Sequence, residues 1–165
     1  IRDSPLPEAQ LDRFIFKLNI TYSTPTEELQ IIERFSRKQK NEITPILSLS
    51  DIFELRGIIE KIYVDPKINQ YIVDLVQATR HPLHLRAGLE KYIQFGASPR
   101  ASIFLNQASR AYAFLKGRAY VVPQDIKTMA LDILRHRLLL TYEAEAEGLT
   151  TDQVIRQILE HVEVP

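Results

Sequence analysis

The stretch GASPRAS, residues 96–102, decides the predicted fold. Ser98 is a strong N-cap residue, Pro99 suits the first helical position, and an apolar run with helical spacing follows to about Gly117. Arg100 therefore falls in the first turn, where free backbone N–H groups and the helix dipole already make the field positive. A cation there is unfavourable unless an anion accompanies it, and helix N-termini bind phosphate readily. The stretch predicts a helix whose first turn presents Arg100 to a phosphate.

Similar start signals and apolar spacing outline further helices on both sides of this stretch. Gly148, after an acidic run, is expected to end the helix that opens at 122–125. Residues 81–95 are expected to form a loop with short extended pieces. The chain is thus predicted to be mainly α, a helical bundle, with helices at about 7–13, 23–40, 50–59, 68–80, 98–117, 122–148 and 151–159.

Residues 14–20 have the pattern of a strand instead. Every second residue from Phe14 to Ile20 is strongly apolar, which is the period of a half-buried strand. A lone strand leaves its backbone groups unpaired and is not stable by itself. Its candidate partners within the chain, 62–64 and 92–95, are very short. We therefore expect its sheet to lie upstream of this sequence, which lacks an initiator Met, and the segment itself to be exposed.

Composition excludes several classes of protein. The 165 residues are 45% hydrophobic, carry a formal net charge of zero and include no Cys, so neither a disulfide framework nor a thiolate zinc site is expected. The neutral charge argues against a strongly basic nucleic-acid binder. No apolar run approaches the ~20 residues that span a bilayer, and the N-terminus has no signal-peptide pattern. We expect a cytoplasmic protein that does not span a membrane.

Two motifs together carry a family resemblance. PLPEAQLDRF, residues 5–14, resembles the segment that closes the core of MoxR-type AAA+ ATPases, and GASPRAS resembles the sensor-2 motif of that family. The family's lid is resembled by YIVDLVQATR at 71–80, GRAYVVPQDI at 117–126 and LRHRL at 134–138. The resemblance covers nearly the whole chain in the right order. It implies a C-terminal piece in which residues 1–22, a short helix plus one strand, are a remnant of the AAA+ core and residues 23–165 are the helical lid domain.

The resemblance also implies roles for two arginines. Arg13 matches the arginine finger, which points at the γ-phosphate held by a neighbouring subunit, and Arg100 matches the sensor-2 arginine, which contacts the nucleotide of its own subunit. A fixed guanidinium stabilises the charge on a transferring phosphoryl group. The family implies ATP and Mg as cofactors, a ring-shaped homo-oligomer that is expected to be a hexamer, and hydrolysis coupled to the remodelling or assembly of client proteins.

The chain departs from the family by lacking two of its motifs. It has no Gly-x-x-x-x-Gly-Lys-Ser/Thr phosphate loop and no acidic Walker B strand end, so it cannot build a Mg-nucleotide site alone. We therefore expect this chain by itself to be inactive and to hold no nucleotide. Two other functions stay open: an all-helical protein-interaction module that never meets nucleotide, and the lid of a DNA-associated AAA+ protein. Neutral charge and the absence of a helix-turn-helix pattern argue against the second.

Each of the two arginines also has a simpler interpretation. Arg13 could be a surface residue that pairs with Glu8 or Asp12, and Arg100 could extend into solvent or pair with a nearby acid.

The remaining polar residues are assigned no site. No metal site is expected, because the polar clusters lack the spacing of metal ligands. Those clusters are His81 with His84, a solvated helix end with Glu143, Glu145 and Glu147, and a solvated group of Arg135, His136 and Arg137.

Overall fold

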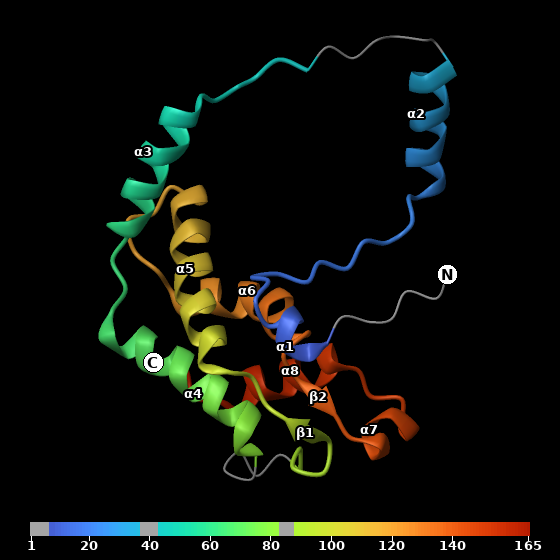
Figure 1. Ribbon diagram of the computed structural model, residues 1–165, viewed down its shortest axis with the longest axis vertical. Helices are drawn as coiled ribbons and strands as arrows, with labels where there is room; N and C mark the ends of the chain where they lie inside the picture. Colours follow the sequence, from blue (N-terminus) through green and yellow to red (C-terminus); the bar gives the residue numbers. More distant parts are fainter. Residues whose placement is uncertain (1–6, 37–42, 83–87) are drawn as a thin grey trace. The chain divides into compact units, whose positions relative to one another are not determined.

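The computed structural model describes residues 7–36, 43–82 and 88–165, and these are predominantly helical, as expected (Figure 1). They form two compact units, one of residues 7–17 with Gly57–Pro165 and one of Leu18–Arg56. No helix in the described ranges is both long and apolar enough to cross a bilayer. The helices and strands are α1 (Glu8–Leu11), α2 (Pro25–Ser36), α3 (Leu49–Glu60), α4 (Pro66–Arg80), β1 (Ile93–Phe95), α5 (Pro99–Leu115), α6 (Pro123–Leu134), β2 (Leu139–Leu140), α7 (Tyr142–Ala146) and α8 (Thr151–His161).

The first unit is a bundle of α4, α5, α6 and α8 around one hydrophobic core (Figure 1). The apolar residues that recur at helical spacing in the sequence point inward, which is why four amphipathic helices are stable here. The core side chains with no exposed surface include Leu75, Leu105, Ile126, Ile133, Ile155 and Ile158.

Local signals fix where these helices begin and end. Ser98 caps α5 and accepts a hydrogen bond from the backbone N–H of Arg100, with Pro99 at the first helical position, as the sequence predicts. Thr150 caps α8 through a capping box with Gln153. Gly117 and Gly148 follow α5 and α7 with φ of 70° and 72°, a left-handed conformation that favours glycine.

The predicted single helix over 122–148 is wrong in its middle. Helix α6 ends at Leu134, and residues 139–140 form β2, which pairs antiparallel with β1 in the register Ile93↔Leu140. Helix α7 then begins at Tyr142 behind an N-cap Thr141. Pairing with β1, which lies some forty residues earlier, outweighs local helix propensity at this point.

The predicted strand at residues 14–20 does not form. Residues 12–15 turn after α1, and residues 16–24 have no regular secondary structure in the part of the chain that is described. The backbone N–H of Lys17 donates to the carbonyl of Asp132 at 2.8 Å instead of to a neighbouring strand. The segment is exposed, as expected for apolar alternation without a sheet, with Phe14 at 59% and Leu18 at 65%.

The second unit contains α2 and most of α3, each with a capping box at its start. Thr24 pairs with Glu27 before α2, and Ser48 pairs with Asp51 before α3. In the described part of the chain neither helix has a buried side chain: the apolar residues of α2 are exposed, and those of α3 are exposed or half-buried. Residues 37–40 of the predicted helix fall outside the described residues. The predicted domains, 1–22 and 23–165, are defined by the family resemblance and not by the compact units of the structure. This division stays a prediction.

Candidate functional site

The carboxylate of Asp12 is the centre of the candidate site. Asp12 lies in the turn after α1, and its two oxygens accept hydrogen bonds from the Ser98 hydroxyl at 3.1 and 3.0 Å. Nη1 of Arg100 donates to Oδ2 at 3.1 Å, and Nε of Arg137 donates to Oδ1 at 3.0 Å. One carboxylate thus joins the turn before Arg13 to the start of α5 and to the segment after α6.

Arg137 is the buried anchor of this network, with its side chain only 1% exposed. Its Nη2 donates to the carbonyls of Asp12, at 2.8 Å, and Phe14, and its Nη1 donates to those of Ile15, at 3.2 Å, and Ile133. A buried guanidinium is tolerated only when its donors are satisfied and its charge is paired. Arg137 therefore holds the backbone of residues 12–15 in place.

The predicted solvated cluster at 135–137 is wrong. Arg135 is 9% exposed and makes a two-pronged ion pair with Asp152, with Nε to Oδ1 at 2.9 Å and Nη2 to Oδ2 at 3.1 Å. Its Nη1 also donates to the carbonyl of Lys17 at 2.6 Å. Nε2 of His136 lies 3.0 Å from the carbonyl of Phe14, and burial lowers the pKa of His136. Through these hydrogen bonds to backbone carbonyls, the three side chains hold the segment that follows α1.

Arg100 lies in the first turn of α5, and it holds a carboxylate. Its side chain is 46% exposed, and its guanidinium pairs with Asp12 rather than with an acid of its own helix, whose first turn has none. Arg13, one residue after Asp12, is exposed, and its side chain has no ion pair in the described part of the structure. The structure thus brings Arg100 close to the turn that carries Arg13.

A cavity of about 250 Å³ opens beside this network. Its wall includes the Asp12 carboxylate, Ser98 and Arg137. The cavity therefore combines charged and polar groups with apolar side chains, such as one from β2. The lining residues are Asp12, Phe95, Gly96, Ser98, His136, Arg137, Leu138 and Leu139.

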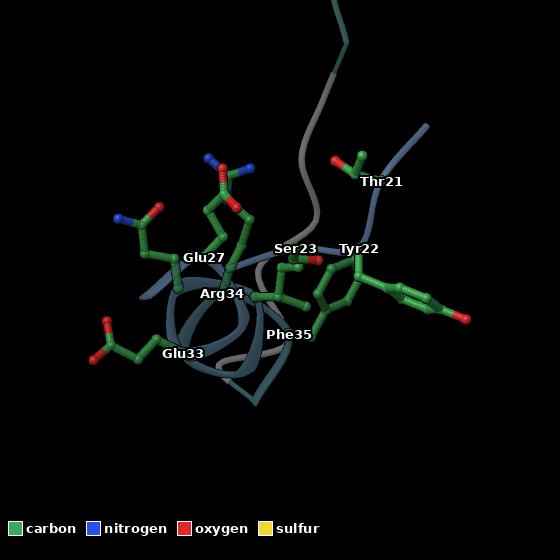
Figure 2. A pocket seen from close by; sticks show the side chains of 9 residues that line it. Thr21, Tyr22, Ser23, Glu27, Glu33, Arg34 and Phe35 are labelled. Atoms are coloured by element: carbon green, nitrogen blue, oxygen red, sulfur yellow. The ribbon is translucent and has the colours of Figure 1, made fainter. Parts of the chain in front are cut away.

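A second hollow, of about 780 Å³, lies within the other unit (Figure 2). Figure 2 shows its lining side chains on α2 and on the residues just before it. All nine are exposed, which describes an open surface rather than an enclosed site. We place the candidate site at Asp12 because its polar groups are partly buried and paired across distant segments.

Acid is expected to weaken the Asp12 network. Burial by itself raises the pKa of Asp12, but the hydrogen bond from Ser98 and the charge of Arg137, with hydrogen bonds from both arginines, lower it below its ordinary value of 3.8. A carboxyl with a depressed folded-state pKa stabilises the fold above its unfolded pKa, and this stability is lost as pH falls through the folded pKa. In urea denaturation, the destabilisation caused by Asp12→Asn should be largest near pH 7 and shrink below about pH 4. A difference independent of pH would contradict the network.

Sequence reasoning singled out Arg13 and Arg100 but missed Asp12 and Arg137 as members of a site. A signal for Arg137 was present, because it lies four residues after the core residue Ile133 and so falls on the buried side of a continuing helical turn. For Asp12 there was no such signal, because the residues around it do not show whether its carboxylate pairs with a neighbour on its own helix or with Arg100, 88 residues away.

The comparisons with known proteins agree with this fold. Residues 86–158, which contain α5, α6 and most of α8, match the AAA lid domain. The crystal structure of a candidate ATPase from Cytophaga hutchinsonii superposes with a TM-score of 0.92 at 45% identity over 98% of this chain and 50% of that one.

Curated relatives match over the same extent. Chaperone MoxR1 of Mycobacterium tuberculosis is 42% identical over 98% of this chain and 43% of its own length, and the uncharacterized protein YeaC of Bacillus subtilis is 40% identical over 98% of this chain and 48% of its own. Protein MoxR of Paracoccus denitrificans is 29% identical over 87% of this chain and 47% of its own length. The chain spans about half the length of the relatives it matches. It belongs to the MoxR-type, chaperone-like AAA+ ATPase family and carries the lid domain of that family.

Proposed function

We propose that this chain is the lid-bearing part of an ATPase that binds Mg-ATP and couples its hydrolysis to the remodelling or assembly of client proteins. The observation that carries the proposal is Arg100: a half-exposed guanidinium in the first turn of α5 that already holds an anion, the Asp12 carboxylate. A helix N-terminus and a guanidinium both favour negative charge, so the same groups fit a nucleotide phosphate. Family membership supports a ring-shaped homo-oligomer, proposed as a hexamer, with a cytoplasmic location.

Each arginine has a distinct task in this proposal. Arg100 acts as sensor 2, binding a phosphate of the ATP held by its own subunit and orienting the lid toward it. Arg13 acts as the arginine finger and extends from its exposed turn to the γ-phosphate in the neighbouring subunit. Phosphoryl transfer depends on such positioned positive charge, because the transferred group and the leaving oxygen develop negative charge. The phosphate loop and the magnesium ligands would come from outside this sequence.

The proposal is tested by removing the Arg100 guanidinium in the full-length ATPase. Arg100→Ala should weaken Mg-ATP binding by about 10- to 150-fold, the equivalent of one charge-assisted contact of ~1.5–3 kcal/mol, and should lower turnover. Arg100→Lys should restore only part of the loss, because an ammonium keeps the charge but lacks the planar fork. Isothermal titration with a slowly hydrolysed ATP analogue measures the affinity.

The matched control is Arg156→Ala, which removes an exposed arginine from the surface of α8. It should leave both affinity and turnover within about twofold, as is usual for surface positions. If Arg100→Ala behaves like Arg156→Ala, Arg100 does not meet nucleotide and the proposed role is wrong.

A further inference from the structure

Asp12 pairs with Arg100, one of the two arginines on which the proposed function depends, and directly precedes the other, Arg13, in the chain. Its Oδ2 faces Arg100 at 3.1 Å and its Oδ1 faces Arg137 at 3.0 Å, while the Ser98 hydroxyl bridges both oxygens. Arg13 is the next residue in the chain. A change in the ion pairs of Asp12 therefore acts on the backbone directly next to Arg13.

The two guanidinium groups hold Asp12 unequally. The side chain of Arg137 is 1% exposed and also clasps the backbone carbonyls of Asp12 and Phe14, so it cannot leave without exposing several unpaired groups. The side chain of Arg100 is 46% exposed and makes one contact to the carboxylate, a pairing that water and salt weaken. Arg100 can therefore exchange Asp12 for another anion while Arg137 and Ser98 keep the carboxylate satisfied.

We infer that Asp12 is a positioning residue that couples nucleotide binding to the arginine finger: a phosphate and the Asp12 carboxylate compete for Arg100, while Arg137 keeps the turn that carries Arg13 seated. This inference depends on the proposed function. Without nucleotide, the Asp12 carboxylate pairs with Arg100, and this ion pair connects the turn that carries Arg13 to the start of α5. When a phosphate takes Arg100, the tie to α5 through that arginine is released and the turn stays fixed by Arg137 and Ser98.

The coupling predicts opposite effects of one substitution on binding and on turnover. In the full-length ATPase, Asp12→Asn removes the competing charge, so affinity for a slowly hydrolysed ATP analogue with Mg²⁺ should rise about two- to fivefold. Turnover should fall about tenfold or more, because the turn that carries Arg13 loses its ionic seat and a small misplacement of a catalytic group is costly. A residue that merely supports the fold would not tighten nucleotide binding.

The double variant Asp12→Asn with Arg100→Ala tests the route. If Asp12 acts through Arg100, its effect on affinity should vanish in the Arg100→Ala background. If Arg100→Ala weakens binding but Asp12→Asn leaves it unchanged or weaker, the coupling is refuted while the proposed role of Arg100 stands. If Arg100→Ala alone has no effect on affinity, the proposed function itself fails, and the coupling fails with it.

A charge series keeps the test decisive if Asp12→Asn folds poorly. Asp12→Ser removes the same charge with a smaller side chain, and Asp12→Glu retains it. Affinity should follow charge, with Ser resembling Asn and Glu resembling the wild type. An order that follows side-chain size instead would overturn the inference.

Discussion

Replacing Arg13 by Ala in the full-length ATPase is expected to lower turnover by about 10³-fold or more while leaving nucleotide affinity nearly unchanged. An arginine finger stabilises charge that develops in the transition state of the neighbouring subunit, so its loss affects the chemical step rather than binding. The structure fits this task because Arg13 projects from an exposed turn whose backbone is held by Arg137 and His136. Steady-state turnover and the dissociation constant, measured on the same preparation, separate the two effects.

Subunit mixing shows that the effect acts in trans. Arg13→Ala subunits mixed with subunits that carry an inactivated phosphate loop should regain part of the activity, because some interfaces then combine an intact finger with an intact nucleotide site. Arg156→Ala, the exposed control on α8, should need no such rescue. If Arg13→Ala keeps wild-type turnover, Arg13 is an ordinary surface residue.

Gly96→Ala is expected to destabilise the first unit by about 3 kcal/mol, enough to lower its melting temperature by roughly 10 °C. A Cβ on Gly96 would lie 2.4 Å from the carbonyl oxygen and 2.6 Å from the carbonyl carbon of Thr79, and 2.8 Å from the backbone N of Arg80. These are backbone atoms at the end of α4, which cannot swing away as a side chain can. Either α4 or the loop before α5 must move.

The displacement would also break the hydrogen bonds that join this loop to α4. The backbone N–H of Ala97 donates to the buried hydroxyl of Thr79 at 2.9 Å, and Nε of Arg80 donates to the carbonyl of Ala97 at 2.7 Å. Buried groups left unpaired add to the cost. Since Arg100 follows four residues later, we also expect its pairing with Asp12 to weaken.

Gly57→Ala is the matched control for this prediction. Gly57 lies within α3, and a Cβ at this position would have no neighbouring atom within 4 Å, so alanine meets open space and improves helix propensity. Thermal unfolding followed by circular dichroism should show Gly57→Ala equal to or slightly more stable than the wild type. A neutral Gly96→Ala would show that the close approach to α4 does not contribute to stability.

Local patterns in the sequence were sufficient to predict most helices. Ser98 with Pro99 marked the start of α5, and Gly117 and Gly148 marked the ends of α5 and α7, because capping and left-handed turns depend on residues close in the chain. The family that GASPRAS and PLPEAQLDRF indicated was confirmed by relatives at 40–42% identity over 98% of the chain. The roles of Arg13 and Arg100 remain predictions.

Long-range pairing could not be read from those patterns. The alternation at residues 14–20 predicts a strand, but a strand forms only beside a partner, and none lies next to this segment in the described chain. Conversely, residues 139–140 continue a helical pattern and yet pair with β1. In both places the secondary structure depends on whether a partner strand lies alongside, and not on the local residue pattern.

The sequence by itself determined the helical class, the start and end of α5 and the position of Arg100 in a first turn, because short-range backbone and capping forces act within a few residues. Only the tertiary structure decided that Asp12 is the partner of the buried Arg137. The energy of that pairing comes from charges 125 residues apart in sequence that meet at 3.0 Å when the core packs. Such contacts leave no local periodicity, since a carboxylate bound to a distant arginine and one that faces water occupy the same kind of turn.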